Sequence, residues 1–141
     1  MIPPGYILVR PETLVGLQKA VEAALGPAAG DCVAAGGRAG GARATAALRG
    51  AAEERVEQLL LQGQAIGWGR FRLERLTPTA LVVTVADSPF ARAYGGAGGP
   101  VCHLTRGVLE ALATAVLGRP APVTETACAA AGAARCRFEA R

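Results

Sequence analysis

The amino-acid sequence predicts an α+β domain in which helices pack on an antiparallel β-sheet. Three observations support this fold class. Apolar residues recur at helical spacing in several segments, the hydrophobic period changes to that of strands near residue 68, and a second pair of short strands ends the chain. The predicted order is three helices, a hairpin, a helix and a second hairpin. A chain of 141 residues is expected to form one domain, residues 1–141.

The first helix is predicted from Pro11 to Leu25. Proline suits the first helical position, and the acidic Glu12 suits the positive end of the helix dipole. One apolar stripe is expected on the buried face, formed by Leu14, Leu17, Val21 and Leu25. Gly26-Pro27 ends the helix. The apolar run from Tyr6 to Val9 just before it is typical of a short strand or an extended arm.

The segment from Ala28 to Ala52 is rich in alanine and glycine, and we expect it to be helical. Each glycine inside a helix costs about 1 kcal/mol relative to alanine, so several of them need a compensating role. The pairs Gly36/Gly40 and Gly37/Gly41 would form a smooth strip along the helix. Tight packing against another helix or a dimer partner is the favoured interpretation, and close approach of a ligand is the alternative. Cys32 is expected to be a small buried residue.

A third helix and a hairpin follow. The helix is predicted from Glu53 to Ile66, with a buried side formed by Val56, Leu59, Leu60 and Ile66. Trp68 to Leu76 then alternates as a half-exposed strand does, whereas Ala80 to Ala86 is apolar on both faces, which predicts a central strand. The short turn at Thr77-Pro78-Thr79 makes these two strands an antiparallel hairpin.

The remaining segments complete the predicted fold. The last helix has an apolar stripe formed by Leu104, Val108, Leu112 and Val116. The segments are a loop or short helix beginning at Asp87 to Phe90, a mobile connector from Gly95 to Pro100, a helix from Val101 or Cys102 to Leu117, and strands from Val123 to Thr126 and from Arg135 to Ala140.

The charge pattern argues against direct nucleic-acid binding. The net charge is +4, but the arginines are scattered and form no basic stripe of the kind that contacts phosphates. No apolar run approaches the length of a membrane-spanning helix, and the first residues lack the charged and apolar regions of a signal peptide. We therefore expect a cytoplasmic protein. Thiols stay reduced there, so clustered cysteines are better candidates for metal ligands or reactive groups than for disulfides.

Three of the four cysteines lie in the last third of the chain, together with a glutamate. Cys102 would begin a helix, where the N–H groups favour a thiolate. Glu125 and Cys128 would end one strand and Cys136 would begin the next, so a hairpin can hold these three on one side. Three thiolates and one carboxylate match the ligand number of a structural zinc site, which leaves no position for a catalytic water. On the residues alone, unlinked buried cysteines are an equal alternative.

His103 is the only histidine of the chain and directly follows Cys102. On a helix it would point about 100° away from its neighbour, which makes it a poor partner ligand. It is either an exposed or capping residue or a residue that faces a ligand cavity.

The sequence resembles a known family. The run from Pro100 to Phe138 contains P-V-C, R-G-V-L, a Gly118-Arg119 turn, E-x-x-C and C-R-F, and it is similar to the 4-vinyl-reductase domain family of predicted hydrocarbon-binding proteins. R-P-E-T-L near the start, and the later G-x-G-R-F and D-S-P-F, also look like that family. The resemblance implies a fold like that of TRAPP vesicle-tethering subunits and haem-NO-binding domains, with an apolar cavity and frequent dimerisation.

The family also includes aromatic-sensing domains of bacterial activators, in which a zinc held by three cysteines and a glutamate braces the pocket. The resemblance carries this structural zinc over to Cys102, Glu125, Cys128 and Cys136. Those sensors hold the phenol hydroxyl with a tryptophan, whose position falls near Val85, and with an upstream histidine, which this chain lacks before His103. The resemblance therefore implies a cavity that favours apolar ligands.

We expect a stand-alone, zinc-braced domain that binds a small apolar or aromatic ligand as a sensor or carrier and forms a homodimer. The candidate pocket residues are aromatic side chains and the histidine: Trp68, Phe71, Phe90, Tyr94 and His103. One alternative is a protein-interaction module of the TRAPP type. Another is an enzyme or accessory protein of tetrapyrrole (bacteriochlorophyll) synthesis, which is less favoured because the sequence has no nucleotide-binding loop or nicotinamide motif.

Overall fold

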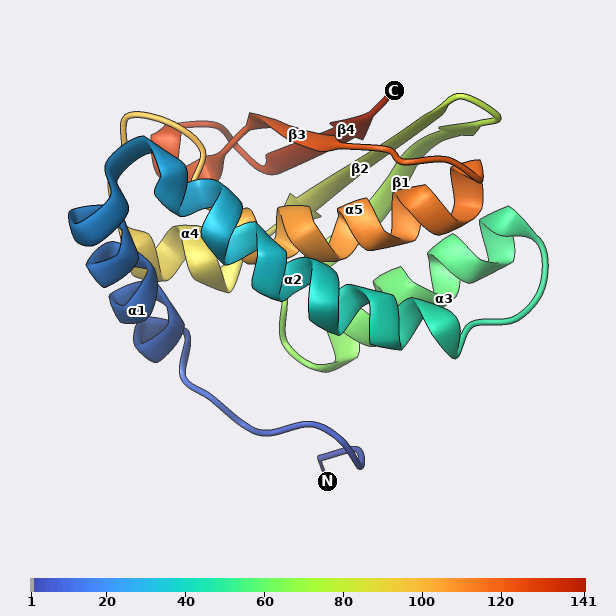
Figure 1. Ribbon diagram of the computed structural model, residues 1–141, viewed down its shortest axis with the longest axis horizontal. Coiled ribbons are helices and arrows are strands. Elements are labelled where there is room, and N and C mark those ends of the chain that lie inside the picture. Colours follow the sequence, from blue (N-terminus) through green and yellow to red (C-terminus); the bar gives the residue numbers. More distant parts are fainter. Residues whose placement is uncertain (1) are drawn as a thin grey trace.

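The computed structural model describes residues 2–141, which form one four-stranded antiparallel sheet and five helices (Figure 1). The elements are α1 (Pro11–Leu25), α2 (Ala29–Ala46), α3 (Ala52–Ala65), β1 (Arg70–Thr77), β2 (Ala80–Ala86), α4 (Pro89–Tyr94), α5 (His103–Leu117), β3 (Val123–Ala127) and β4 (Cys136–Ala140). The predicted α+β class with an antiparallel sheet is confirmed. Within residues 2–141, none of the helices combines the length and apolarity needed to span a membrane.

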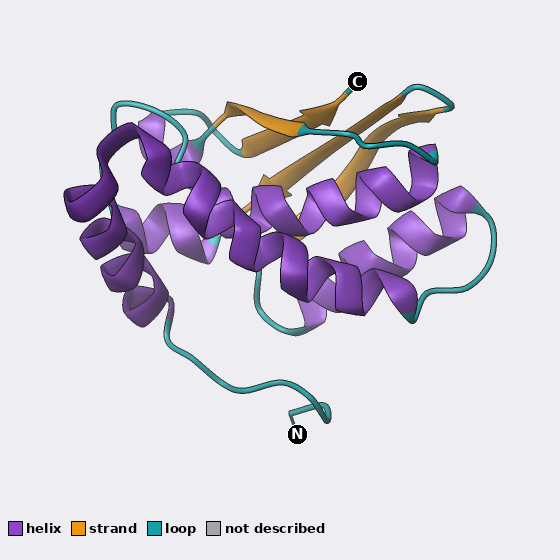
Figure 2. Ribbon diagram, in the orientation of Figure 1, coloured by secondary structure: helices purple, strands orange, loops and turns teal. Residues whose placement is uncertain are grey.

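The helices are layered on the sheet. α5 packs on β3 and β4, α3 packs on β1, and α2 packs on α5 (Figure 2). α1 lies at one end of the molecule, where it contacts α4 and α2 (Figure 1). The helix that begins directly after Cys102 is therefore held between the sheet and α2.

β2 is the centre of the sheet, whose strand order is β1-β2-β4-β3. It pairs antiparallel with β1 and with β4, and it is buried along nearly its whole length, as its apolar sequence predicted. Alternate residues of this strand, Leu81, Val83 and Val85, join the core cluster together with Phe138 of β4 and Leu112 of α5. The second hairpin therefore places its last strand inside the sheet and β3 at the edge.

The extent of α1 was predicted correctly, but its buried face was not. Leu17 and Leu25 are 61% and 50% exposed, whereas the buried residues of the helix are Val15 and Gln18. The reason is that this terminal helix is docked by polar contacts as well as apolar ones: Gln18 Nε2 donates to the backbone oxygen of Val101 at 2.9 Å. The preceding segment forms an extended arm rather than a strand.

The glycines of α2 allow it to lie directly against α5. A Cβ atom added to Gly37 would lie 2.2 Å from the backbone oxygen of Leu104, and one added to Gly107 of α5 would lie 2.0 Å from the backbone oxygen of Ala34. Both distances are far below van der Waals contact, so no larger residue fits without moving a helix. The favoured interpretation, helix–helix packing, is confirmed, and both helices belong to the same chain.

The expectation that Cys32 is buried is wrong, because this residue is exposed. The buried positions of α2 recur every three or four residues on the face that meets α5: Ala34, Gly37, Gly41 and Thr45. Cys32 falls outside this face. Gly36 and Gly40 are also exposed, so only one of the two predicted glycine pairs serves the contact.

We expect Gly107→Ala to destabilise the protein by about 3 kcal/mol, because the added methyl group would overlap the Ala34 carbonyl and push α2 away from α5. Gly40→Ala is the matched control. A Cβ at Gly40 meets no atom within 4 Å, so its higher helix propensity should stabilise the protein by about 0.5–1 kcal/mol. Urea unfolding of both variants measures the difference, and equal stabilities would contradict the close approach of the two helices.

Candidate metal centre

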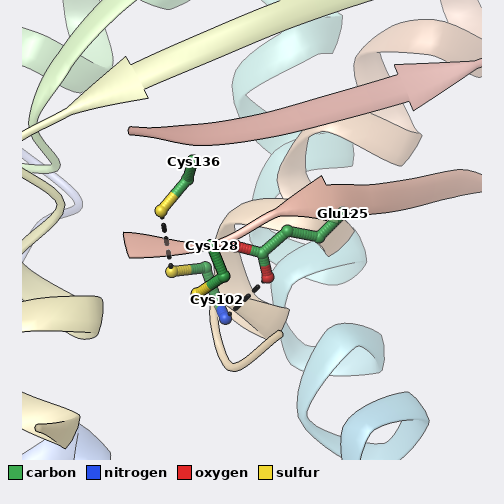
Figure 3. A group of neighbouring side chains, drawn as sticks. All are labelled: Cys102, Glu125, Cys128 and Cys136. Carbon is green, nitrogen blue, oxygen red and sulfur yellow. Dashed lines mark hydrogen bonds between the residues drawn. The ribbon is translucent and has the colours of Figure 1, made fainter. Parts of the chain in front are cut away.

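Four side chains capable of binding a metal meet where the start of α5 approaches the β3–β4 hairpin (Figure 3). They come from the N-cap of α5 (Cys102), from β3 (Glu125), from the residue after β3 (Cys128) and from the first residue of β4 (Cys136). One candidate ligand atom from each residue lies within 4.8 Å of the others, and all four residues are buried. These are the four residues that the sequence grouped together.

The turn between β3 and β4 brings Cys128 and Cys136 to the same side. A register shift near the end of β3 interrupts the strand pairing, and the chain then passes through a short 3-10 turn at Ala129–Ala131. Gly132 ends this turn with a φ of 100°, a conformation that glycine adopts readily. The backbone N–H of Ala129 donates to Cys136 Sγ at 3.4 Å. The turn thus positions two sulfur atoms and provides a hydrogen bond to one of them.

The carboxylate of Glu125 is only partly satisfied by protein atoms. Its Oε1 accepts a hydrogen bond from the backbone N–H of Cys102 at 3.0 Å, while its Oε2 is buried and has no hydrogen-bond partner. Such an oxygen has lost its water without a replacement, which costs free energy. Cys102 Sγ lies 3.7 Å from Cys136 Sγ, so the carboxylate shares its site with closely spaced sulfur atoms (Figure 3).

The four groups resist carrying negative charge together. Burial raises the pKa of the Glu125 carboxyl and of the Cys128 thiol, because the charged forms lose their hydration. The hydrogen bond with Cys136 raises the pKa of Cys102, and the same bond lowers the pKa of Cys136. A divalent cation reverses this balance, because it compensates the charge and favours the deprotonated ligands.

The donor set fits zinc. Three thiolates and one carboxylate are ligand types that zinc accepts, and four is the number of ligands in a structural zinc site. The unpartnered Oε2 of Glu125 is the independent sign that the protein atoms alone do not complete the site. Because the chain supplies four ligands, the arrangement resembles a closed structural site and not a catalytic one.

The aromatic candidates for a ligand pocket do not all meet. Trp68 and Phe90 pack edge to face, with ring centroids 5.0 Å apart and an interplanar angle of 78°. Phe71 packs against Gly63 of α3 and lines a surface groove of about 370 Å³ between α3 and β1. Of the three rings, Trp68 and Phe90 are the pair in direct contact near the start of α4.

Tyr94 and His103 have separate surroundings near α1 and α2. The Tyr94 hydroxyl donates to Glu22 Oε1 at 2.6 Å, and this hydrogen bond raises the pKa of Tyr94. The His103 ring packs against Gly30, its Nδ1 is buried without a hydrogen-bond partner, and burial lowers its pKa. The role of all five candidates in ligand binding stays a prediction.

Sequence reasoning missed Ser88. This buried residue is the N-cap of α4: its Oγ accepts from the backbone N–H of Ala91 at 3.3 Å and lies 3.4 Å from Cys102 Sγ. Serine followed by proline is typical of a helix start, so the cap could have been recognised in D-S-P-F. The contact with Cys102 joins positions 14 residues apart and had no signal in the sequence.

Comparison with known proteins confirms the resemblance to the 4-vinyl-reductase domain family. The model of this domain matches residues 81–141, the part that contains all four candidate ligands. The phenol-responsive sensory domain of the transcription activator PoxR, solved with phenol, has a similar structure, with a TM-score of 0.82 and 20% sequence identity. The alignment covers 96% of this chain and 75% of that one.

A vinyl-4-reductase family protein from Methanocaldococcus jannaschii is also similar in structure, with a TM-score of 0.61, 12% identity, and coverage of 99% of this chain and 98% of that one. No curated protein matches the sequence. At these identities the two structures show that the fold is shared.

We expect Glu125→Gln to separate metal binding from folding. Burying an amide costs less than burying a carboxylate, and the amide oxygen can still accept from the Cys102 N–H, so metal-free protein should melt at an unchanged or higher temperature. Affinity for Zn²⁺ should fall, because the amide carries no charge. Calorimetry with and without a chelator, together with zinc titration, checks both parts. A large loss of stability in the metal-free variant would show that the carboxylate stabilises the fold without a metal.

Proposed function

We propose that the protein is a zinc-braced domain that binds a small apolar or aromatic molecule as a sensor or carrier. The observation that carries this proposal is the buried set of three cysteines and one glutamate, with an unpartnered carboxylate oxygen, in a fold shared with a phenol-responsive sensory domain. The proposal has two parts, a structural role for the metal and a ligand-binding role for the fold, which can be tested separately.

Cys102, Glu125, Cys128 and Cys136 would hold the zinc. The ion would supply a cross-link of four protein ligands, which joins the start of α5 to the β3–β4 hairpin. The chain prepares this site with the hydrogen bond from the Cys102 N–H to Glu125 and with the one from the Ala129 N–H to Cys136. With no ligand position left open, the zinc would brace the fold and would not activate water.

The ligand would be more apolar than phenol. Val85, where the aromatic sensors are expected to carry a tryptophan, is buried on β2 and pairs with Cys136 of β4. A valine offers no hydrogen bond to a hydroxyl, and the only histidine follows the metal ligand Cys102. Burying an unpaired hydroxyl costs about 1–3 kcal/mol, so phenols should bind less well than hydrocarbons of the same shape.

The oligomeric state and location belong to the same proposal. Ile7 and Leu8 are adjacent in the N-terminal arm and are 84% and 83% exposed. Neighbouring side chains of an extended segment point to opposite sides, so both sides of the arm expose apolar surface that a second copy in a homodimer would cover. We also propose a cytoplasmic location, because three clustered thiols bind zinc only when they remain reduced.

The second candidate function is a protein-interaction module of the TRAPP type. The same exposed apolar residues favour it, together with Leu17 on α1, because they can equally dock a different protein. This candidate requires no ligand and therefore predicts that no small molecule binds. The ligand test below distinguishes the two functions.

We expect purified protein to contain one zinc per chain, and we expect Cys128→Ala to lose the zinc and to lower the melting temperature by about 10 °C, equivalent to roughly 3 kcal/mol for a chain of this size. Native mass spectrometry measures the metal, and calorimetry measures the stability. Cys32→Ala is the matched control, since Cys32 is exposed and outside the cluster, and it should keep both zinc and stability. Full zinc content and unchanged stability in Cys128→Ala would contradict the brace.

We expect toluene to bind about tenfold more tightly than phenol, because the predicted site lacks a partner for the hydroxyl. Trp68 is the only tryptophan and contacts Phe90, so its fluorescence can report binding, with calorimetry as an independent measurement. Val85→Trp should shift the preference toward phenol if the pocket lies beside β2. If no aromatic compound gives saturable binding, the sensor or carrier function is wrong and the interaction module is favoured.

A further inference from the structure

We propose that Ser88 is a positioning residue that links the metal centre to α4: its hydroxyl donates a hydrogen bond to Cys102 Sγ while it caps the helix. Metal binding and the order of α4 would then depend on each other. This inference rests on the proposed zinc site, and it adds a residue that is not a ligand, together with a route from the metal to the aromatic pair at Trp68.

The hydrogen-bonding capacity of the hydroxyl sets the direction of this contact. A serine hydroxyl has one proton to donate and two lone pairs that accept. The backbone N–H of Ala91 uses one lone pair at 3.3 Å, which leaves the proton for Cys102 Sγ at 3.4 Å. A metal-bound thiolate has no proton, so with a metal present Cys102 must accept and Ser88 must donate. Ser88 is 4% exposed, so water does not compete easily for this proton.

The metal would strengthen the contact. A hydrogen bond to a thiolate is charge-assisted, whereas the same contact with a thiol pairs two weakly polar groups in either direction. Groups that donate to metal ligands orient those ligands, and their loss typically weakens metal binding by about 10–100-fold. Ser88 would therefore hold Cys102 in place for the metal, and the metal would in turn fix the hydroxyl that caps α4.

α4 depends on such support. It has six residues, far fewer than the roughly 12–15 that an isolated helix needs, so its order comes from its cap and its contacts. The turn before it is also constrained: Asp87 has a φ of 56°, and its carboxylate accepts from Arg70 Nε at 2.9 Å. This ion pair ties the turn to β1 and keeps Ser88 at the end of β2.

The contacts of α4 extend away from the metal centre in two directions. Phe90 meets the ring of Trp68 in the segment before β1. Tyr94 donates to Glu22 of α1, and Lys19 of the same helix donates to the Tyr94 backbone oxygen at 3.1 Å. A change in the order of α4 would therefore reach both an aromatic contact of the candidate pocket and the N-terminal helix.

Three substitutions separate the hydrogen bond to sulfur from the cap. Ser88→Thr keeps the hydroxyl and both contacts. Ser88→Gly removes the hydroxyl but weakens the cap by only a few tenths of a kcal/mol. Ser88→Ala removes both functions. Zinc affinity is measured by competition with a chromophoric chelator, and the environment of the sulfur ligands is followed by the sulfur-to-metal absorption of protein loaded with Co²⁺. Hydrogen exchange of residues 91–94, with and without zinc, reports the order of α4.

We expect Ser88→Gly and Ser88→Ala to weaken zinc binding by about 10-fold or more and to shift the Co²⁺ absorption, while Ser88→Thr stays within about threefold of the unsubstituted protein. Zinc should slow exchange in residues 91–94 of the unsubstituted protein and of Ser88→Thr, and should have less effect in the other two variants. Circular dichroism of each variant checks that it is folded, and a variant that does not fold leaves the comparison to the remaining pair.

Two results would overturn the inference. If the unsubstituted protein binds zinc and Ser88→Gly shows the same affinity, spectrum and exchange, Ser88 only caps α4, and the zinc proposal survives. If the unsubstituted protein binds no zinc, the proposed metal site and the link through Ser88 are both wrong.

Discussion

The contact between α2 and α5 is the constraint on which the rest of the molecule depends. At Gly37 and Gly107 the two helices approach so closely that a single added carbon atom would meet backbone oxygen. α5 is also pressed against β3 and β4 on its other side, so it cannot shift in either direction without a clash. Its first turn, and with it Cys102, therefore has a defined position relative to the hairpin that carries the other candidate ligands. Four residues from three elements can meet within 4.8 Å because this helix is held on both sides.

The sequence predicted the parts of this arrangement that depend on local pattern. The alternation and apolarity of residues 68–86 predicted the first hairpin, and the spacing of Cys102, Glu125, Cys128 and Cys136 around a helix start and a turn allowed them to be grouped. The errors lie where tertiary contacts override pattern. Leu17 and Leu25 share a helical stripe but are exposed, because α1 is docked at the edge of the molecule partly through the hydrogen bond of Gln18. No periodicity indicates which polar residue will replace an apolar contact.

The candidate ligand residues show the same limit from the other side. Aromatic side chains are the obvious choice for an apolar pocket, yet they also fill ordinary cores. Phe71 packs on α3, Tyr94 forms a hydrogen bond to α1, and Trp68 and Phe90 pack on each other. Which of these uses a residue has depends on neighbours far away in sequence. Ser88 was missed for a related reason: its capping role is local and visible, whereas its contact with Cys102 depends on how β2 and α5 are placed by the sheet.

A closed set of four ligands and a domain that responds to a small molecule are compatible only if the metal acts through structure. Zinc with no open position cannot take part in a chemical step, but it can fix where α5 and the hairpin stand. The elements next to it are less strongly held: α4 has six residues and no long apolar face, and it contacts α1 largely through the polar residues Tyr94, Glu22 and Lys19. A rigid centre beside a marginal helix is the arrangement in which small binding energies can change order locally without unfolding the core. The metal would then set the reference against which α4 moves, and ligand binding would act on the aromatic contact that α4 carries.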